Sequence, residues 1–225
     1  MPSVQEFYGR RAALYDRIAT APGIGRWRRI AARRVAGPGD TVVEMGCGTG
    51  ANLPYLREQV GPEGRVIGVD ITGPLLERAR ERVEGYDNVA VTRGDATAPP
   101  VESADGVLAT FVCGLFADPA SVVDRWCDLL VPGGRIGLLD ATASESPLGR
   151  FLNPPFRAFV AAGSPNCGLA DVLFAPFGDV DASLSSRVEA ARTVLAERAV
   201  DRRYETFGVG LVGLLSGTVP GDSRP

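Results

Sequence analysis

Three glycines at alternate positions, Gly46, Gly48 and Gly50, are the clearest chemical feature of this sequence. They follow a short apolar run of strand length and precede a helix-like stretch. A strand, a glycine turn and a helix N-terminus together commonly hold a nucleotide or a related anionic or polar group, because glycine lets the backbone approach a ligand closely. Glu44 precedes the turn and Cys47 lies inside it. The glycine pattern alone is weak evidence, because it also satisfies the dinucleotide fingerprint, and a turn that binds nothing is the alternative.

Further candidate residues end the next apolar runs of the chain. Asp70 ends the second run, where a carboxylate can accept both hydroxyls of a ribose. Asp95 and Ala96 follow the third run, and Phe111 ends the fourth. The carboxyl ends of neighbouring parallel strands meet at one edge of a sheet, where ligands bind in open α/β proteins. The spacing therefore predicts a single pocket for a nucleotide-like ligand.

Two absences exclude several kinds of chemistry. The sequence contains no histidine, and all 24 of its basic residues are arginine. A Walker A phosphate loop and a pyridoxal Schiff base both need a lysine. Ser-His-Asp triads and histidine-rich metal sites are excluded as well. The four cysteines are scattered without a C-x-x-C pair, so we expect reduced, structural thiols and no metal site.

The composition indicates an ordinary globular protein. The chain has 225 residues, 45% of them hydrophobic, and a formal net charge of -3, so no basic surface for nucleic acid is indicated. No apolar run approaches the length of a membrane span. The first residues lack the apolar core of a signal peptide, and we therefore expect a cytoplasmic protein.

The elements that must position these residues follow an alternating pattern. Five apolar runs read as parallel strands and two more as a hairpin: 41–45, 65–69, 89–92, 106–111, 135–139, 200–207 and 209–215. Helix-like segments lie at about 3–18, 26–35, 51–60, 73–84, 119–130 and 183–198. This alternation predicts an α/β fold with a doubly wound, mostly parallel seven-stranded sheet and an antiparallel C-terminal hairpin.

Four motifs together support a family resemblance. Residues 42–50 resemble the first motif of the class I S-adenosylmethionine-dependent methyltransferases, and residues 66–70 and 94–96 resemble the next two. Residues 129–135 are similar to the L-x-P-G-G turn before the fifth strand of that family. The likeness covers roughly residues 5 to 140 and implies a Rossmann-like methyltransferase fold with S-adenosyl-L-methionine as cofactor.

Within that family the sequence resembles two groups. Residues 15–16 and 23–28 are similar to ubiquinone/menaquinone C-methyltransferases. Residues 50–54 and 152–154 look more like phospholipid N-methyltransferases. The two likenesses leave open whether a quinol carbon or an amine nitrogen is methylated, and they imply a small-molecule or lipid-like acceptor.

The resemblance also implies roles for individual residues. The first motif would surround the methionine part of the cofactor, with Glu44 near its amino group. Asp70 would bind the ribose, and Ile71 and Asp95 would contact the adenine, with Ala96 behind it. Tyr8, Tyr15 and Asp16 would close the N-terminal helix over the pocket. The expected cofactor-binding set is Glu44, Gly46, Cys47, Gly48, Gly50, Asp70, Ile71, Asp95, Ala96, Phe111 and Tyr15.

The domain organisation expected from these patterns has three parts. Residues 1–38 would form an N-terminal helical lid, residues 39–219 the Rossmann-like methyltransferase domain, and residues 220–225 a frayed tail. Prolines punctuate an irregular insertion at about 141–180. The apolar residues of 151–177 either line an acceptor pocket or close the core at the edge of the sheet.

The sequence assigns no catalytic residue. An amine acceptor needs only its lone pair, whereas a quinol carbon or a hydroxyl would benefit from a general base. Asp140, Glu145 and Asp16 are candidates, but each is equally well explained as a surface charge, a cap or an ion pair. Any membrane contact is expected to be transient. The alternatives to an enzyme of this family are a non-catalytic module that binds S-adenosylmethionine and a nicotinamide-dependent dehydrogenase, for which the Tyr-x-x-x-Lys pair is missing.

Overall fold

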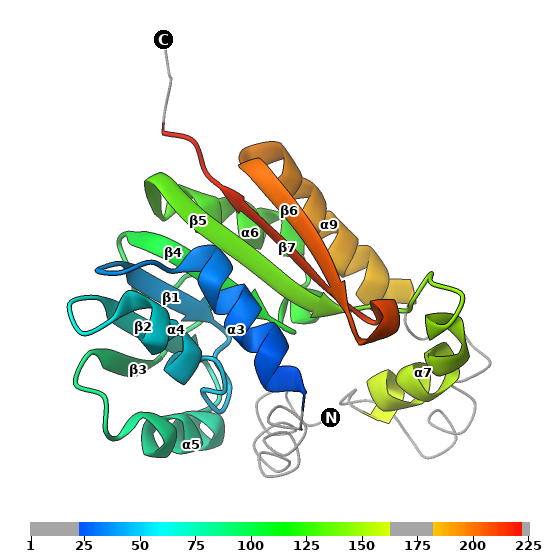
Figure 1. Ribbon diagram of the computed structural model, residues 1–225, viewed down its shortest axis with the longest axis horizontal. Coiled ribbons are helices and arrows are strands. Elements are labelled where there is room, and N and C mark those ends of the chain that lie inside the picture. The colour runs from blue at the N-terminus through cyan, green and yellow to red at the C-terminus, as the bar shows by residue number, and fades with distance from the viewer. Residues whose placement is uncertain (1–22, 163–181, 222–225) are drawn as a thin grey trace.

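The computed structural model describes residues 23–162 and 182–221 of the chain. In this part of the chain, seven strands form one sheet in the order β3-β2-β1-β4-β5-β7-β6 (Figure 1). The strands are β1 (Thr41–Met45), β2 (Arg65–Asp70), β3 (Val89–Arg93), β4 (Ala104–Thr110), β5 (Leu130–Ala141), β6 (Val200–Phe207) and β7 (Val212–Thr218). Strands β1 to β5 pair in parallel, and β7 runs antiparallel to both β5 and β6.

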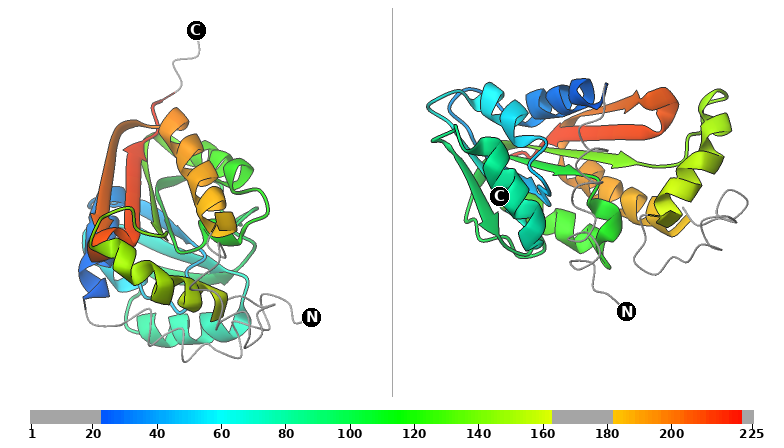
Figure 2. Two further views of the ribbon diagram at one scale, coloured as in Figure 1. Left: turned by 90° about the vertical axis from the view of Figure 1, so that its right-hand side faces the viewer. Right: turned by 90° about the horizontal axis from the view of Figure 1, so that it is seen from below.

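Helices cover both faces of this sheet (Figure 2). The helices are α3 (Ile24–Val35), α4 (Leu53–Val60), α5 (Gly73–Val83), α6 (Pro119–Asp128), α7 (Asn153–Ala162) and α9 (Ala182–Arg198), with short 3-10 helices η1 (Cys113–Leu115), η2 (Gly149–Leu152) and η4 (Gly208–Gly210). Helices α3, α4 and α5 bury apolar side chains on one face, and α6 and α9 do so on the other. The expected doubly wound α/β fold with its antiparallel hairpin is confirmed.

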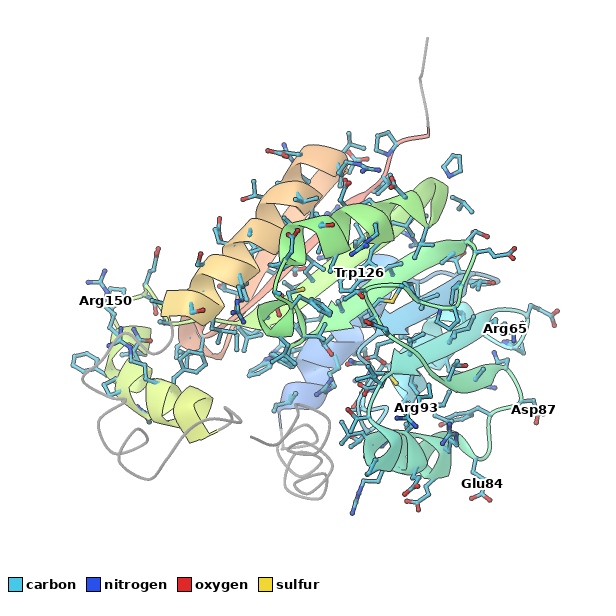
Figure 3. All side chains as sticks on the ribbon, turned by 180° about the vertical axis from the view of Figure 1, so that it is seen from behind. Arg65, Glu84, Asp87, Arg93, Trp126 and Arg150 are labelled. Atoms are coloured by element: carbon cyan, nitrogen blue, oxygen red, sulfur yellow. The ribbon has the colours of Figure 1, made fainter. Side chains whose placement is uncertain are left out.

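The α6 face is built around Trp126, which is fully buried against the sheet (Figure 3). Its indole Nε1–H donates a hydrogen bond of 2.7 Å to the carbonyl oxygen of Ala96, in the loop after β3. A buried indole N–H needs such an acceptor. The bond therefore fixes one loop of the carboxyl edge to the helix layer.

Five strands differ from the sequence prediction at their ends, and the largest differences are in β5 and β7. Strand β5 begins at Leu130 rather than at residue 135, because the Pro132–Gly134 segment continues as an irregular part of the strand with Gly133 at φ 82°. Strand β7 begins at Val212 rather than at 209, because Val209 adopts a left-handed conformation with φ 53° inside η4. Positive φ angles interrupt the extended backbone, and apolar character alone does not signal them.

The N-terminal segment of the predicted domain scheme, residues 1–38, is described in part. The helix expected at 3–18, with Tyr8, Tyr15 and Asp16, lies outside the described residues. Helix α3 packs into the core through Ala31 and Val35, both fully buried, so this part of the expected lid belongs to the layered body. The boundary at residue 38 stays a prediction.

Within the expected irregular insertion, the described residues include η2 and α7. Pro154 and Pro155 stand in the first turn of α7, where a helix needs no backbone N–H partner. Asn153 fixes the start of this helix, since its side chain accepts from the Ser144 N–H at 2.7 Å and donates to the Ser144 carbonyl at 3.0 Å. Two of the prolines that suggested an irregular chain therefore begin a helix, whereas Pro165 and Pro176 lie outside the described residues.

Candidate cofactor-binding site

The glycine turn joins β1 to α4 at the carboxyl edge of the sheet. Gly46, Gly48 and Gly50 all lie in the left-handed region, with φ of 69°, 54° and 74°. A Cβ on Gly46 would stand 2.7 Å from a methyl group of Val112, and one on Gly50 would stand 3.0 Å from the Cβ of Ala79. These positions therefore require glycine, and the turn presents backbone rather than side chains.

A buried hydrogen-bond network lies directly beneath the turn. Asn52 is at the N-terminus of α4, and its side-chain amide donates to the Oε1 of Glu44 and, at 2.8 Å, to the hydroxyl of Thr110. Arg28 of α3 donates to the side-chain oxygen Oδ1 of Asn52 at 2.7 Å. The network thus ties α3, α4, β1 and β4 together around one carboxylate.

Glu44 has a half-satisfied carboxylate. Its side chain is 1% exposed, and its Oε2 has no hydrogen-bond partner. Burial raises the pKa of Glu44 to about 7, although the Asn52 hydrogen bond and the charge of Arg28 oppose this rise. Buried polar atoms are rarely left without a partner. The free oxygen is therefore suited to receive a donor, and a cationic one would favour the ionised form.

Asp70 links the glycine turn to the next helix. Its Oδ2 accepts from the Gly48 N–H at 2.9 Å, and its Oδ1 accepts from the Thr72 N–H at 2.8 Å, just before α5. An ionised carboxylate has about four acceptor positions. Two acceptor positions of Asp70 therefore remain for a ligand, on the exposed part of this half-buried side chain.

The other expected site residues are placed in different ways. Ile71 is 39% exposed beside Asp70. Asp95 is exposed and accepts from the Thr97 N–H at 2.8 Å within its own turn, so it has no hydrogen bond to the Glu44 network. The Cys47 side chain turns into the core, where burial raises the pKa of its thiol well above the ordinary range. Only the backbone of Cys47 is therefore available to a ligand.

Phe111 follows directly after the end of β4 and has a strained conformation. Its φ is 57°, and its N–H donates to the Leu139 carbonyl at 2.8 Å. The Arg28 guanidinium lies 6.0 Å from the centre of the Phe111 ring. A bulky residue with positive φ is unusual and occurs mostly at functional turns. The strand end thus carries an aromatic ring next to the network of Glu44.

Four residues of this site were missed by sequence reasoning: Arg28, Asn52, Arg82 and Thr110. Arg28 sits in an arginine-rich helix, where charged side chains ordinarily face solvent, yet it is only 4% exposed. Arg82 of α5 donates to the carbonyl and, at 3.2 Å, to the hydroxyl of Thr49 in the glycine turn. Asn52 alone had a local signal, because Asn is typical at the start of a helix.

Residues 23–162 and 182–221 contain no group of three or more acidic or cysteine side chains able to hold a metal ion. In the same part of the chain, every helix is too short or too polar to cross a membrane.

The antiparallel strand β7 and the glycine turn above the buried Glu44 together indicate a fold that binds a nucleotide-type ligand. Comparison with known proteins identifies the family. Residues 42–134 match a family described as a methyltransferase domain. The 2-phytyl-1,4-naphtoquinone methyltransferase of Thermosynechococcus vestitus is 30% identical over 177 residues, which are 76% of this chain and 79% of that protein. The chain therefore belongs to the class I S-adenosylmethionine-dependent methyltransferases.

Two further comparisons agree with this assignment. The nocamycin O-methyltransferase of Saccharothrix syringae is 39% identical over 139 residues, or 58% of this chain, and the match spans about half of that protein, 48%. A crystal structure of a SAM-dependent methyltransferase from Aquifex aeolicus has a TM-score of 0.59 at 16% identity, covering 92% of this chain and 98% of that one. At this identity the structure supports the fold alone.

Proposed function

We propose that this enzyme transfers the methyl group of S-adenosylmethionine to a ring carbon of a quinol-type acceptor. The observation that carries the acceptor class is the likeness to the 2-phytyl-1,4-naphtoquinone methyltransferase, which extends over three quarters of the chain. This likeness favours the quinone group of the family over the phospholipid N-methyltransferases. A cytoplasmic location and a transient membrane contact remain predictions.

The residues of the glycine turn fit the cofactor. The unpartnered Oε2 of Glu44 is suited to the ammonium of the methionine part, and the Gly46–Gly50 turn offers backbone groups without side chains to its carboxylate. The remaining acceptor positions of Asp70 fit the two ribose hydroxyls. We assign the adenine to the space between Ile71 and Asp95, with Ala96 behind it and Phe111 at the border. Cys47 contributes backbone only, and a role for Tyr15 stays a prediction.

The protein's part in the reaction is mainly orientation. S-adenosylmethionine supplies a methyl group activated by a positive sulfur, so no metal or covalent residue is required. The Glu44 and Asp70 carboxylates would hold the cofactor on either side of its sulfur, at the methionine ammonium and at the ribose, and this would fix the direction of the methyl group. Such positioning accounts for a large share of catalysis in displacement reactions.

Calorimetric titration and a methyl-transfer assay test this function. The purified chain should bind S-adenosylmethionine and S-adenosylhomocysteine at micromolar concentration and should not bind NAD. It should then methylate a chemically reduced, demethylated naphthoquinone and not phosphatidylethanolamine vesicles. Transfer to the phospholipid alone would show that the acceptor is a phospholipid amine and not a quinol. Cofactor binding without transfer to any acceptor would favour a non-catalytic module, and binding of NAD alone would refute the cofactor assignment.

A further inference from the structure

A second buried polar cluster lies at the carboxyl edge of the sheet, beside the cofactor site. It consists of Asp140 at the end of β5, Cys113 in η1 and Arg192 of α9, and the half-exposed Tyr204 of β6 borders it. Asp140 follows Leu139, which pairs with Thr110 of the Glu44 network. Since neighbouring strands lie about 4.8 Å apart, the end of β5 is roughly 10 Å from the end of β1. The cluster lies on the α9 face of the sheet and the Glu44 network on the opposite face, but both lie at the same carboxyl edge, where a second substrate could meet a cofactor held at β1 and β2.

Asp140 is buried with one oxygen unused. The side chain is 2% exposed, and its Oδ2 has no hydrogen-bond partner. The Cys113 thiol bonds to this carboxylate, and burial keeps the thiol protonated because it raises the pKa of Cys113 well above the ordinary range. The remaining oxygen is therefore an acceptor without a donor, which is costly unless a ligand supplies one.

Arg192 is the matching half of the cluster. Its Nε and Nη2 atoms are inaccessible and have no hydrogen-bond partner. The guanidinium lies 5.2 Å from the centre of the Tyr204 ring, which fixes its plane. Gly213 of β7 pairs with Asp140 and lies beneath the guanidinium, where a Cβ would stand 2.6 Å from Nη2. A glycine at this point thus makes room for a cation next to the carboxylate.

We propose that Asp140 and Arg192 bind the ring hydroxyl of the acceptor, with Asp140 as the general base that takes its proton and Arg192 as the cation that stabilises the resulting oxyanion. A hydroxyl donates one hydrogen bond and accepts others, so it satisfies Oδ2 and the two guanidinium N–H groups at once. An amine acceptor has no such need for a base. This inference rests on the proposed function, because it identifies how the same enzyme would activate a phenolic ring.

The protons and electron pairs of the proposed methyl transfer balance. Asp140 takes the hydroxyl proton, and the electron pair of the O–H bond moves into the ring. The ring carbon then bonds to the methyl group as the carbon–sulfur bond breaks and its electron pair stays on sulfur. Loss of the proton on that ring carbon to solvent restores the aromatic ring, and Asp140 returns its proton to the ring oxygen. No oxidant or reductant is consumed.

The charges around Asp140 suit this task. Burial raises the pKa of Asp140 to about 6, and the charge of Arg192 and the bond from Cys113 oppose the rise. The charged and titratable groups facing it come from η1 and α9, namely Cys113 and Arg192, with Tyr204 behind the arginine. A base is most effective when its pKa lies near the working pH while it remains ionised. The ring oxygen therefore meets an ionised carboxylate at neutral pH.

The first test measures activity with Asp140→Asn and Arg192→Gln in the full chain. Matched controls are Asp128→Asn and Arg198→Gln, which remove an exposed ion pair on α6 and the same helix α9. Loss of a general base typically costs about 100- to 10,000-fold in rate. We expect a fall in kcat of that size for Asp140→Asn, with S-adenosylmethionine affinity unchanged within about twofold, and near wild-type rates for the controls. Asp140→Asn activity within threefold of wild type would overturn the proposal.

A second test needs neither cofactor nor turnover. The absorption of bound 1-naphthol, a redox-stable phenol, reports whether its hydroxyl is ionised. In the wild-type chain we expect bound naphthol to ionise at a lower pH than free naphthol, and in Arg192→Gln we expect that pH to rise by at least one unit. No naphthol binding, or the same ionisation in both proteins, would refute the site. If naphthol behaves as expected while no quinol is methylated, the proposed function fails and the hydroxyl site stands.

Discussion

Glu44→Gln tests the buried carboxylate beneath the glycine turn. The substitution keeps the shape of the side chain and an oxygen for the Asn52 amide, but it removes the ionisable group. The pKa of Glu44 is raised by burial from 4.5 to about 7. One pKa unit corresponds to about 1.4 kcal/mol, so full ionisation of Glu44 costs the folded chain on the order of 3 kcal/mol.

The sign of the pH dependence follows from proton binding. Between pH 4.5 and about 7 the folded state keeps a proton on Glu44 that the unfolded state has lost. The free energy of unfolding therefore falls as the pH rises through this window and stays lower above it. Glu44→Gln lacks this contribution, so relative to wild type it should gain about 3 kcal/mol between pH 4 and pH 8.

Urea unfolding of the cofactor-free chain at a series of pH values measures this difference. Asp140 titrates in an overlapping pH window, since its pKa is raised from 3.8 to about 6. Taking the difference in unfolding free energy between the variant and wild type at each pH cancels the contribution of Asp140. Glu58→Gln, which deletes an exposed carboxylate 3.6 Å from Arg29, is the control. A difference between Glu44→Gln and wild type that is constant with pH would show that burial does not hold a proton on Glu44, and the reasoning would fail.

Three further substitutions probe the same edge of the sheet. Asp70→Ala should weaken S-adenosylmethionine binding about 10- to 100-fold in calorimetry, because it removes the ribose acceptor and leaves the Gly48 N–H unpaired; unchanged affinity would disprove the ribose placement. Gly46→Ala should lower the free energy of unfolding by about 1 to 3 kcal/mol, since the new Cβ meets Val112 at positive φ. Adding Val112→Ala should recover part of that loss, and no recovery in thermal unfolding would exclude the contact as the cause. Asp95→Ala should reduce the preference for the adenine cofactor over its inosine analogue, and an equal preference in both proteins would argue against an adenine contact.

The sheet was predictable because its signals are local. Strands β1 and β6 have the bounds that their strand-like runs predicted, and the breaks at glycine and proline clusters separated the strands from the helices. The glycine turn was equally plain, since its conformation needs residues without a Cβ. Deviations occurred where single residues such as Val209 adopt positive φ, which side-chain type does not reveal.

The interior of the site was not predictable, because its contacts join distant parts of the chain. Arg28 meets Asn52 across 24 residues, and Asn52 meets Thr110 across 58. In a helix with several arginines, the sequence does not show which one points into the core. The Asp140 and Arg192 pair likewise forms only when α9 packs against β5. Long-range packing, rather than local pattern, assembled both polar clusters.

The most direct test of the account uses S-adenosylmethionine with a deuterated methyl group and a reduced, demethylated naphthoquinone. Mass spectrometry and NMR of the product locate the label. We expect an intact labelled methyl group on a ring carbon of the quinol, with S-adenosylhomocysteine formed in equal amount. A label on an oxygen or nitrogen atom, or no transfer by a chain that binds the cofactor, would contradict it.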